Sequence, residues 1–194
     1  MDLQDLCGRA RLDRDALRAV FRVGSRVYGT DHPGSDEDFV VVLARQDARQ
    51  DLLFGPDFNV ILHGVDSFQR SLDEPSVLAL EAWFAPPPHR LLEPRPPFRC
   101  KPDRRRLLAA ASERARSDFA KARKTFEDEP EAARKKVFHA LRVAMFARQI
   151  VRHGKLLRFD EASHLPALLR SFDRWTAIEK HFGPELEALL NAPR

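Results

Sequence analysis

The chain has 194 residues, a length of one to two domains. Hydrophobic residues make up 43% of it and charged residues 32%, which excludes a disordered chain and a membrane protein. Residues 1–100 carry 12 basic and 16 acidic side chains, whereas residues 101–194 carry 21 basic and 13 acidic ones. This uneven charge suits a metal site in the acidic part and a surface for a polyanion in the basic part.

The sequence gives no indication of export or of a membrane anchor. No stretch has the ~18 apolar residues of a spanning helix, and the N-terminus lacks the basic and apolar segments of a signal peptide. The two cysteines, Cys7 and Cys100, share no metal-ligand spacing and are expected to be free thiols. A cytoplasmic protein without a membrane partner is therefore predicted.

The first half of the chain predicts a small sheet with short helices. The first dozen residues are polar and irregular, and residues 13–18 predict a short helix that leads into a strand at residues 20–23. Residues 24–38 contain three glycines and a proline and are expected to form a loop. Strands are predicted next at residues 39–44 and 59–63, separated by a polar segment, and helices at residues 65–72 and 77–84.

Six prolines between residues 86 and 97 mark the predicted domain boundary, because proline continues neither a helix nor a central strand. Everything beyond Lys101 has helical periodicity, and helices are predicted at residues 104–127, 131–153, 165–172 and 175–191. The sequence therefore predicts an α+β fold, with a sheet and helices in residues 1–95 and an all-α bundle in residues 96–194.

Two aspartates carry the first indication of chemistry. Asp36 and Asp38 lie two residues apart at the start of the predicted strand, so both side chains leave the same face of an extended backbone. Two adjacent carboxylates repel each other unless a cation lies between them. Magnesium is the natural cation for this position, because it binds carboxylate oxygens and keeps coordination positions open for substrate phosphates.

The dipeptide Gly24-Ser25 at the end of the preceding strand provides the second indication. A glycine turn followed by serine presents backbone N–H groups and a hydroxyl without steric obstruction, which predicts a small cradle for phosphate groups. Together with the aspartates, the cradle would bind a metal–triphosphate unit from two sides. Phosphoryl chemistry depends mostly on such positioning and charge neutralisation.

The whole arrangement resembles a known family. The run Gly-Ser-Arg-Val-Tyr-Gly-Thr at residues 24–30, followed by Pro-Gly-Ser-Asp-Glu-Asp at residues 33–38 and a valine-rich strand, resembles the nucleotidyltransferases of the DNA polymerase β superfamily. Within that superfamily it is similar to the bacterial and phage branch that includes RNA-repair-associated members. The resemblance implies a minimal nucleotidyltransferase domain with a mixed sheet, packed against the helical domain with the active site in the cleft between them.

The resemblance extends into the second half of the chain. The segment Glu-Ala-Trp-Phe-Ala-Pro at residues 81–86 matches a Glu-x-x-aromatic-x-Pro element of the branch. A Lys-x-x-x-His-x-x-Arg pattern is matched by Lys135, His139 and Arg142, and a Gly-Lys-Leu turn follows at residues 154–156. These three side chains lie at i, i+4 and i+7, on one face of a helix, where they are expected either to meet phosphates or to form an ordinary solvated face.

The family's third carboxylate is missing. Its expected position is occupied by Asn59, whose amide can ligate a metal through its oxygen but cannot accept a proton at neutral pH. Asp57, two residues earlier, is a candidate substitute, whereas Glu37 is expected on the opposite side of its strand. His63 is a further candidate base, although a structural role is the commoner one for such a histidine.

The expected reaction is attack of an acceptor hydroxyl on the α-phosphorus of a nucleoside triphosphate, with release of pyrophosphate. Asp36 and Asp38 are expected to bind Mg²⁺ or Mn²⁺ and to be catalytic. The remaining site residues are expected to bind the substrate: Gly24, Ser25, Arg26, Lys135, His139 and Arg142. The last three would close the cleft from the helical domain.

An RNA end is the expected acceptor, because of the basic second half and the resemblance to RNA-repair-associated enzymes. Two alternatives come from other classes of protein. The first is a nucleotidyltransferase that modifies a protein or a small molecule. The second is an inactive module that binds a nucleotide or RNA, which the asparagine at position 59 suggests.

Overall fold

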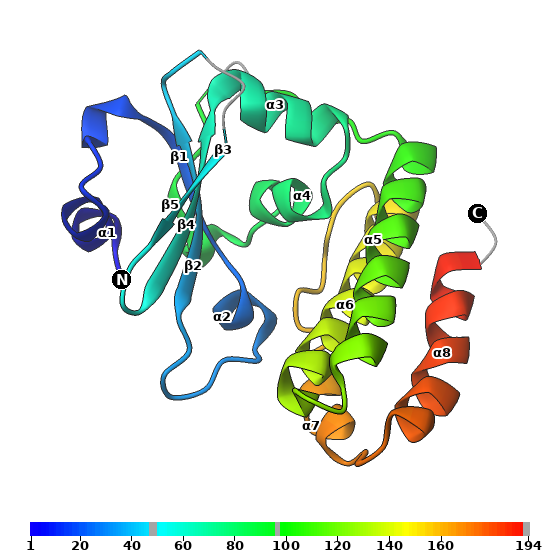
Figure 1. Cartoon of the computed structure of the whole chain (residues 1–194). Coiled ribbons are helices and arrows are strands. Elements are labelled where there is room, and N and C mark those ends of the chain that lie inside the picture. Colours follow the sequence, from blue (N-terminus) through cyan, green and yellow to red (C-terminus); the bar gives the residue numbers. More distant parts are fainter. Residues whose placement is uncertain (47–49, 96–97, 192–194) are drawn as a thin grey trace. The chain divides into compact units, whose positions relative to one another are not determined.

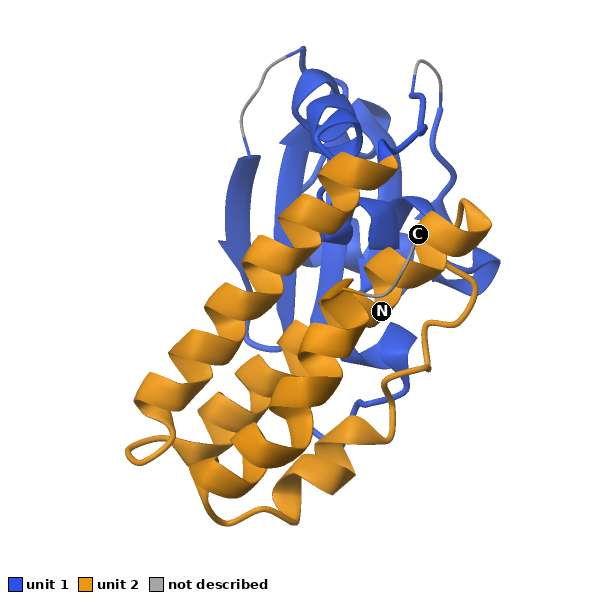
Figure 2. Ribbon diagram, turned by 90° about the vertical axis from the view of Figure 1, so that its right-hand side faces the viewer, with its two compact units in different colours: residues 1–103 blue, residues 104–194 orange. Residues whose placement is uncertain are grey.

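The computed structural model describes residues 1–46, 50–95 and 98–191. The chain forms two compact units, Met1–Asp103 and Arg104–Arg194 (Figure 2). The proline-rich segment thus falls within the first unit, and the division comes after it. No helix in the described ranges combines the length and the apolar character needed to cross a membrane.

The first unit is built on a five-stranded sheet with the strand order β3-β4-β2-β1-β5. Its strands are β1 (Leu17–Val23), β2 (Glu37–Leu43), β3 (Gln50–Phe54), β4 (Phe58–Gly64) and β5 (Arg90–Leu92). The pair β2–β4 is parallel, and the pairs β1–β2, β1–β5 and β3–β4 are antiparallel. The sheet is therefore mixed, and the predicted α+β class is confirmed.

Helices cover both faces of this sheet (Figure 1). Helix α1 (Leu3–Ala10) covers one face, where its Leu6 joins the buried side chains of Val20, Phe39 and Val41. Helices α3 (Val65–Asp73) and α4 (Val77–Trp83) lie on the other face, and Phe68 of α3 stacks on Phe21 with ring centroids 5.8 Å apart. Alternate residues of each central strand therefore point into different apolar layers, as the period of a strand requires.

Four short elements complete the first unit: η1 (Arg14–Ala16), the one-turn helix α2 (Ser25–Tyr28), the turn η2 (Pro87–His89) and the edge strand β5. The prediction of an irregular N-terminus was wrong, because Asp2 accepts a hydrogen bond from the Asp5 amide and caps α1. No strand was predicted in the polar segment before residue 55, where β3 forms. The predicted loop from residue 24 contains α2.

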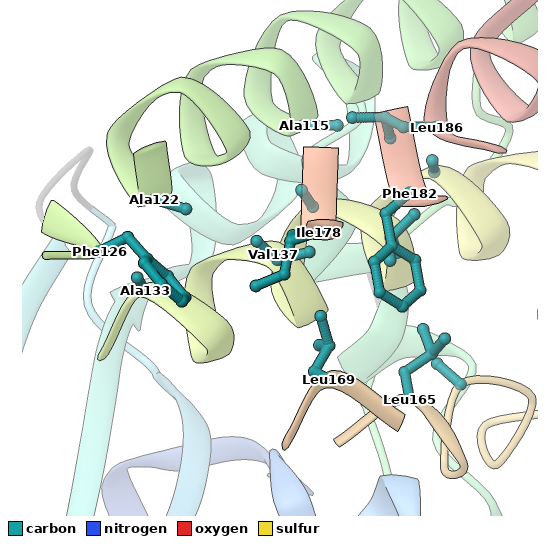
Figure 3. Packing of buried hydrophobic residues seen from close by; sticks show 14 of the residues in the cluster. Ala115, Ala122, Phe126, Ala133, Val137, Leu165, Leu169, Ile178, Phe182 and Leu186 are labelled. Carbon is teal, nitrogen blue, oxygen red and sulfur yellow. The ribbon is translucent and has the colours of Figure 1, made fainter. Parts of the chain in front are cut away.

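The second unit is helical, with α5 (Arg104–Thr125), α6 (Pro130–His153), α7 (Leu165–Arg170) and α8 (Trp175–Asn191). These bounds lie within a few residues of the predicted ones. Helix α6 ends at Gly154, whose φ of 73° is the left-handed conformation that glycine adopts most readily. Figure 3 shows the core of this unit, in which alanines of α5 and α6 and larger side chains such as Val137, Ile178 and Phe182 belong to one buried cluster.

Candidate functional site

The sharp turn after β1 sets the geometry of the candidate site. Gly24 follows Val23, the last residue of β1, and has φ 81° and ψ −162°, a conformation essentially reserved for glycine. Its carbonyl oxygen accepts from the Val27 amide at 2.9 Å, which closes the single turn of α2. The amides of Ser25 and Arg26 precede this first intrahelical donor, so the turn presents N–H groups at the end of the strand.

The Gly24 backbone lies directly against the Asp38 carboxylate. A Cβ atom on Gly24 would be 2.2 Å from Asp38 Oδ2, a separation that no real contact allows. This closeness follows from the sheet, because Asp38 is opposite Val23 in the antiparallel pair β1–β2. The structure thus brings the predicted phosphate cradle and one predicted metal ligand into contact.

Asp38 also contacts the residue at the position of the missing carboxylate. It is the register partner of Asn59 in the parallel pair β2–β4, and Asn59 Nδ2 donates to Asp38 Oδ1 at 3.0 Å. Burial raises the pKa of Asp38, the hydrogen bond from Asn59 lowers it, and the negative charge of Asp36 raises it, with a net increase. Asp36 is exposed and lies just before β2. The charges of the two aspartates are therefore coupled.

Glu37, the residue between the two aspartates, has different neighbours from theirs. Glu37 accepts from Arg22 Nε at 3.1 Å and from the amino group of Met1 at 2.9 Å. Burial raises the pKa of Glu37, but the Met1 amino group, Arg22 and Arg26 lower it more strongly, so the net pKa is below its ordinary value. Glu37 is therefore an ion-pair partner on the side away from Asp38.

Arg26 and Ser25 occupy the two positions after the glycine. Ser25 is half-buried at the first position of α2, and Arg26 is exposed. The guanidinium of Arg26 spans the loop before β2, with Nη2 donating to the Ser35 carbonyl at 3.3 Å and Nη1 lying 3.8 Å from Asp31 Oδ2. Arg26 thus holds the loop before β2 in place. To bind phosphate as predicted, its guanidinium would have to leave these contacts.

The two candidate substitutes for the missing carboxylate, Asp57 and His63, are engaged elsewhere. The Asp57 carboxylate is ion-paired with Arg9 of α1, whose guanidinium lies over the Phe58 ring on the other face of the sheet. His63 is four residues further along β4, about 13 Å away at the rise of a strand. It is buried, and its Nδ1 lies 3.0 Å from Ser67 Oγ.

A buried hydrogen bond that the sequence did not reveal anchors helix α2. Tyr28, the last residue of α2, donates its hydroxyl to the carboxylate of Glu81 on α4, and both side chains are buried. The resemblance had marked both residues, the first in the glycine-serine run and the second in the Glu-x-x-aromatic-x-Pro element. Their contact indicates that the two motifs cooperate to fix the cradle turn.

The three basic positions of α6 lie in the second unit and differ from one another in exposure. Lys135 is exposed, His139 is half-buried, and Arg142 is buried with its guanidinium over the rings of Phe138 and Phe146. The expectation of an ordinary solvated face therefore does not hold for Arg142. The role of these residues in substrate binding remains a prediction.

His139 is held by a carboxylate that the sequence analysis missed. Asp118 of α5 is buried, and its Oδ2 lies 2.6 Å from His139 Nδ1 and accepts from Arg114 Nε at 2.8 Å. Burial and the nearby charge of Arg142 lower the pKa of His139 more than Asp118 raises it. The net pKa of His139 is therefore below its ordinary value, so its surroundings disfavour the charged form. The spacing of Arg114 and Asp118, four residues apart on a helix, was the available signal.

Replacing Asn59 by aspartate is expected to destabilise the metal-free protein and to make its stability depend on magnesium. The change removes the donor to Asp38 and adds a charge beside two carboxylates, which should lower the free energy of unfolding by about 1–3 kcal/mol. Millimolar Mg²⁺ should restore that loss in Asn59→Asp and act less on wild type. Urea titrations with and without Mg²⁺ measure both effects, and the control of similar shape is Asn59→Leu, which should respond to the ion no more than wild type.

No family model matches the sequence, and no curated protein matches it significantly. A nucleotidyltransferase-like protein from Exiguobacterium sibiricum 255-15, known from its crystal structure, is similar to 97% of this chain over 73% of its own length. The sequence identity is 14% and the TM-score is 0.34. Among the described residues, no group of three or more His, Cys, Asp or Glu side chains is arranged to hold a metal ion.

Proposed function

We propose that this protein is a magnesium-dependent nucleotidyltransferase that moves a nucleoside monophosphate from a nucleoside triphosphate to an acceptor hydroxyl. The observation that carries the proposal is the contact between the Gly24 turn and the Asp38 carboxylate. A strand that ends in a glycine turn has no structural need to lie against a half-buried acid. The contact does, however, put backbone N–H groups beside a metal ligand, which is the arrangement a metal–triphosphate unit requires.

The residues present fit a divalent cation. Asp36 and Asp38 supply carboxylates, the charge of Asp36 raises the pKa of Asp38, and Asn59 supplies an amide oxygen in the same row as Asp38. A bound magnesium would neutralise charge on the triphosphate and on the attacking and leaving oxygens. Ser25 and the amides after Gly24 would hold the β- and γ-phosphates, which fixes the α-phosphorus for in-line attack.

An RNA end is the proposed acceptor. The second unit contributes exposed cations, among them Arg148, Arg152 and Lys155 near the end of α6, that match a phosphate backbone. Phosphate-driven binding should weaken steeply with salt, whereas transfer to a protein or small molecule should depend little on salt.

A nucleotide-binding module without turnover is the second candidate, and the Asn59–Asp38 hydrogen bond favours it. With an amide in place of the third carboxylate, the side chain bonded to Asp38 in this row cannot take the proton from the attacking hydroxyl. The two candidates separate cleanly, because a binding module is stabilised by a triphosphate but releases no pyrophosphate. Asn59→Asp should generate pyrophosphate release only if turnover was lost at this position.

The test is thermal denaturation with each of the four ribonucleoside triphosphates, with and without Mg²⁺. A ligand at a hundredfold excess over its Kd stabilises the folded state by about 2.7 kcal/mol, which gives a shift of several degrees. The shift should need Mg²⁺ and should vanish in Asp36→Ala/Asp38→Ala.

A charge-matched control is Asp66→Ala/Glu74→Ala, which removes two exposed carboxylates of α3 and its C-terminal end and should keep the shift. If no triphosphate stabilises wild type, or if the aspartate variant responds like wild type, the proposed site is wrong.

A further inference from the structure

A single row of side chains crosses four strands of the sheet at the candidate site. Val23 of β1 is opposite Asp38 of β2, Asp38 is level with Asn59 of β4, and Asn59 is opposite Phe54 of β3. Register partners in neighbouring strands point to the same face. Phe54 therefore shares a face and a row with the proposed metal ligands, two strands from Asp38 or about 10 Å at the spacing of paired strands.

Phe54 is strongly exposed. Its side chain is 74% exposed, the largest value among the large hydrophobic residues in the described ranges, and Leu52 on the same face of β3 is 56% exposed. Leu53, which points to the opposite face, packs against the core cluster under α1. The edge strand thus has one covered face and one apolar face in solvent, and the uncovered face continues the row that contains Asp38.

The turn after Phe54 holds this exposed side chain in place. The Gly55 amide donates to the Phe58 carbonyl at 2.8 Å, and the Gly55 backbone lies so close to the Phe58 ring that a Cβ would be 2.1 Å from it. Asp57, at the end of the turn, is ion-paired with Arg9 of α1. A fixed backbone lowers the entropy cost of using Phe54 as a binding surface.

The order of residues in this row, from β1 to β3, indicates which part of a substrate would reach Phe54. The Gly24 turn, the proposed triphosphate cradle, lies at the β1 side of Asp38, whereas Asn59 and Phe54 lie at the other side. The attacking hydroxyl must approach the α-phosphorus opposite the leaving pyrophosphate. The acceptor therefore enters over Asn59, toward the exposed aromatic ring.

We propose that Phe54, extended by Leu52, is a stacking platform for the unpaired terminal base of a single-stranded RNA acceptor. This assignment rests on the proposed function. An exposed aromatic ring stacks on any base, because every base has a π-face, so such a platform positions an RNA end without reading its sequence. The row would then bind triphosphate, metal and acceptor in spatial order from β1 to β3.

The test is fluorescence anisotropy with a labelled ten-nucleotide single-stranded RNA, in the absence of nucleoside triphosphate. Phe54→Ala should weaken binding about 5- to 150-fold, the range found when one base–aromatic stack is removed, and Phe54→Tyr should bind like wild type. The same RNA with an abasic 3′ nucleotide separates stacking from other effects. Loss of the terminal base should weaken wild type and leave Phe54→Ala unchanged. Leu168→Ala, which removes an exposed leucine of α7, is the control and should not affect binding.

Three results would overturn the platform. The first is equal RNA affinity for wild type and Phe54→Ala. The second is a Phe54→Ala variant that loses affinity for triphosphate but not for RNA, which would assign the ring to the incoming nucleotide. The third is a change of molar mass in light scattering between wild type and Phe54→Ala, which would make the edge strand an interface between copies. Mg²⁺-dependent stabilisation by triphosphate, measured on the same samples, shows whether the proposed function itself has failed.

Discussion

Gly24→Ala is expected to abolish Mg²⁺-dependent stabilisation by nucleoside triphosphate and to lower the free energy of unfolding. The backbone conformation at Gly24 costs a non-glycine residue about 1–3 kcal/mol, and the added methyl group would overlap Asp38 Oδ2 as well. To relieve the overlap, either the turn or the carboxylate must move, and each movement separates the cradle from the metal ligand. Urea denaturation and triphosphate titration of the same preparation measure both losses.

Gly34→Ala is the matched control for this substitution. Gly34 also has a positive φ, 92°, but no heavy atom outside Gly34 and its two chain neighbours lies within 4 Å of the position a Cβ would take. It should therefore carry backbone strain alone and keep the triphosphate response. If Gly34→Ala loses that response as fully as Gly24→Ala, strain in the loop rather than contact with Asp38 is the cause.

His63→Gln is expected to make the protein less sensitive to acid. Burial and the charge of Arg45 lower the pKa of His63 to about 4 from an ordinary value of 6.5. The unfolded chain therefore binds a proton that the folded chain refuses as the pH falls from about 6.5 to 4, so His63 contributes full stability above pH 6.5 and loses it through this window. Between pH 7.5 and 4.5, wild type should lose about 2–3 kcal/mol more free energy of unfolding than His63→Gln.

Urea titrations followed by circular dichroism at the two pH values give this difference, and titratable groups common to both proteins cancel in it. Glutamine retains an amide that can bond Ser67 Oγ, as His63 Nδ1 does at 3.0 Å. His32→Gln, in the exposed loop before β2, should lose as much stability on acidification as wild type. Parallel behaviour of His63→Gln and wild type would show that His63 is protonated in the folded state.

Elements with a strong periodic pattern were predictable from the sequence. The long helices α5 and α6 and the β-branched run of β2 have apolar spacings that only one structure satisfies. Helix α1 and strands β3 and β5 were not predictable in this way. Leu6 is the one fully buried residue of α1, and β3 is polar or exposed along most of its length, so their structure comes from tertiary contacts.

The candidate site was predictable where its residues are close in the sequence. Gly24, Ser25, Asp36 and Asp38 share one short segment, and the glycine turn at its start and the strand that begins at its end follow from local composition. The contacts across the sheet were not predictable, because register joins residues from distant segments. Asn59 was expected to replace the third carboxylate with a neutral amide. Its hydrogen bond to Asp38 was not expected, because it depends on how β4 pairs with β2.

The pairing of β1 has a consequence for the order in which the chain can fold during synthesis. β1 is one of the first elements made, yet its second neighbour, β5, ends at Leu92. The sheet therefore cannot be completed before almost the whole first unit has left the ribosome, and until then β1 has an unpaired edge. In the second unit, α5 and α6 follow each other in the sequence and pack against each other, so this pair has no such delay. The unit made first is thus the one that must wait for a distant part of the chain, and one edge of β1, the strand that leads into the Gly24 turn, stays unpaired during that time.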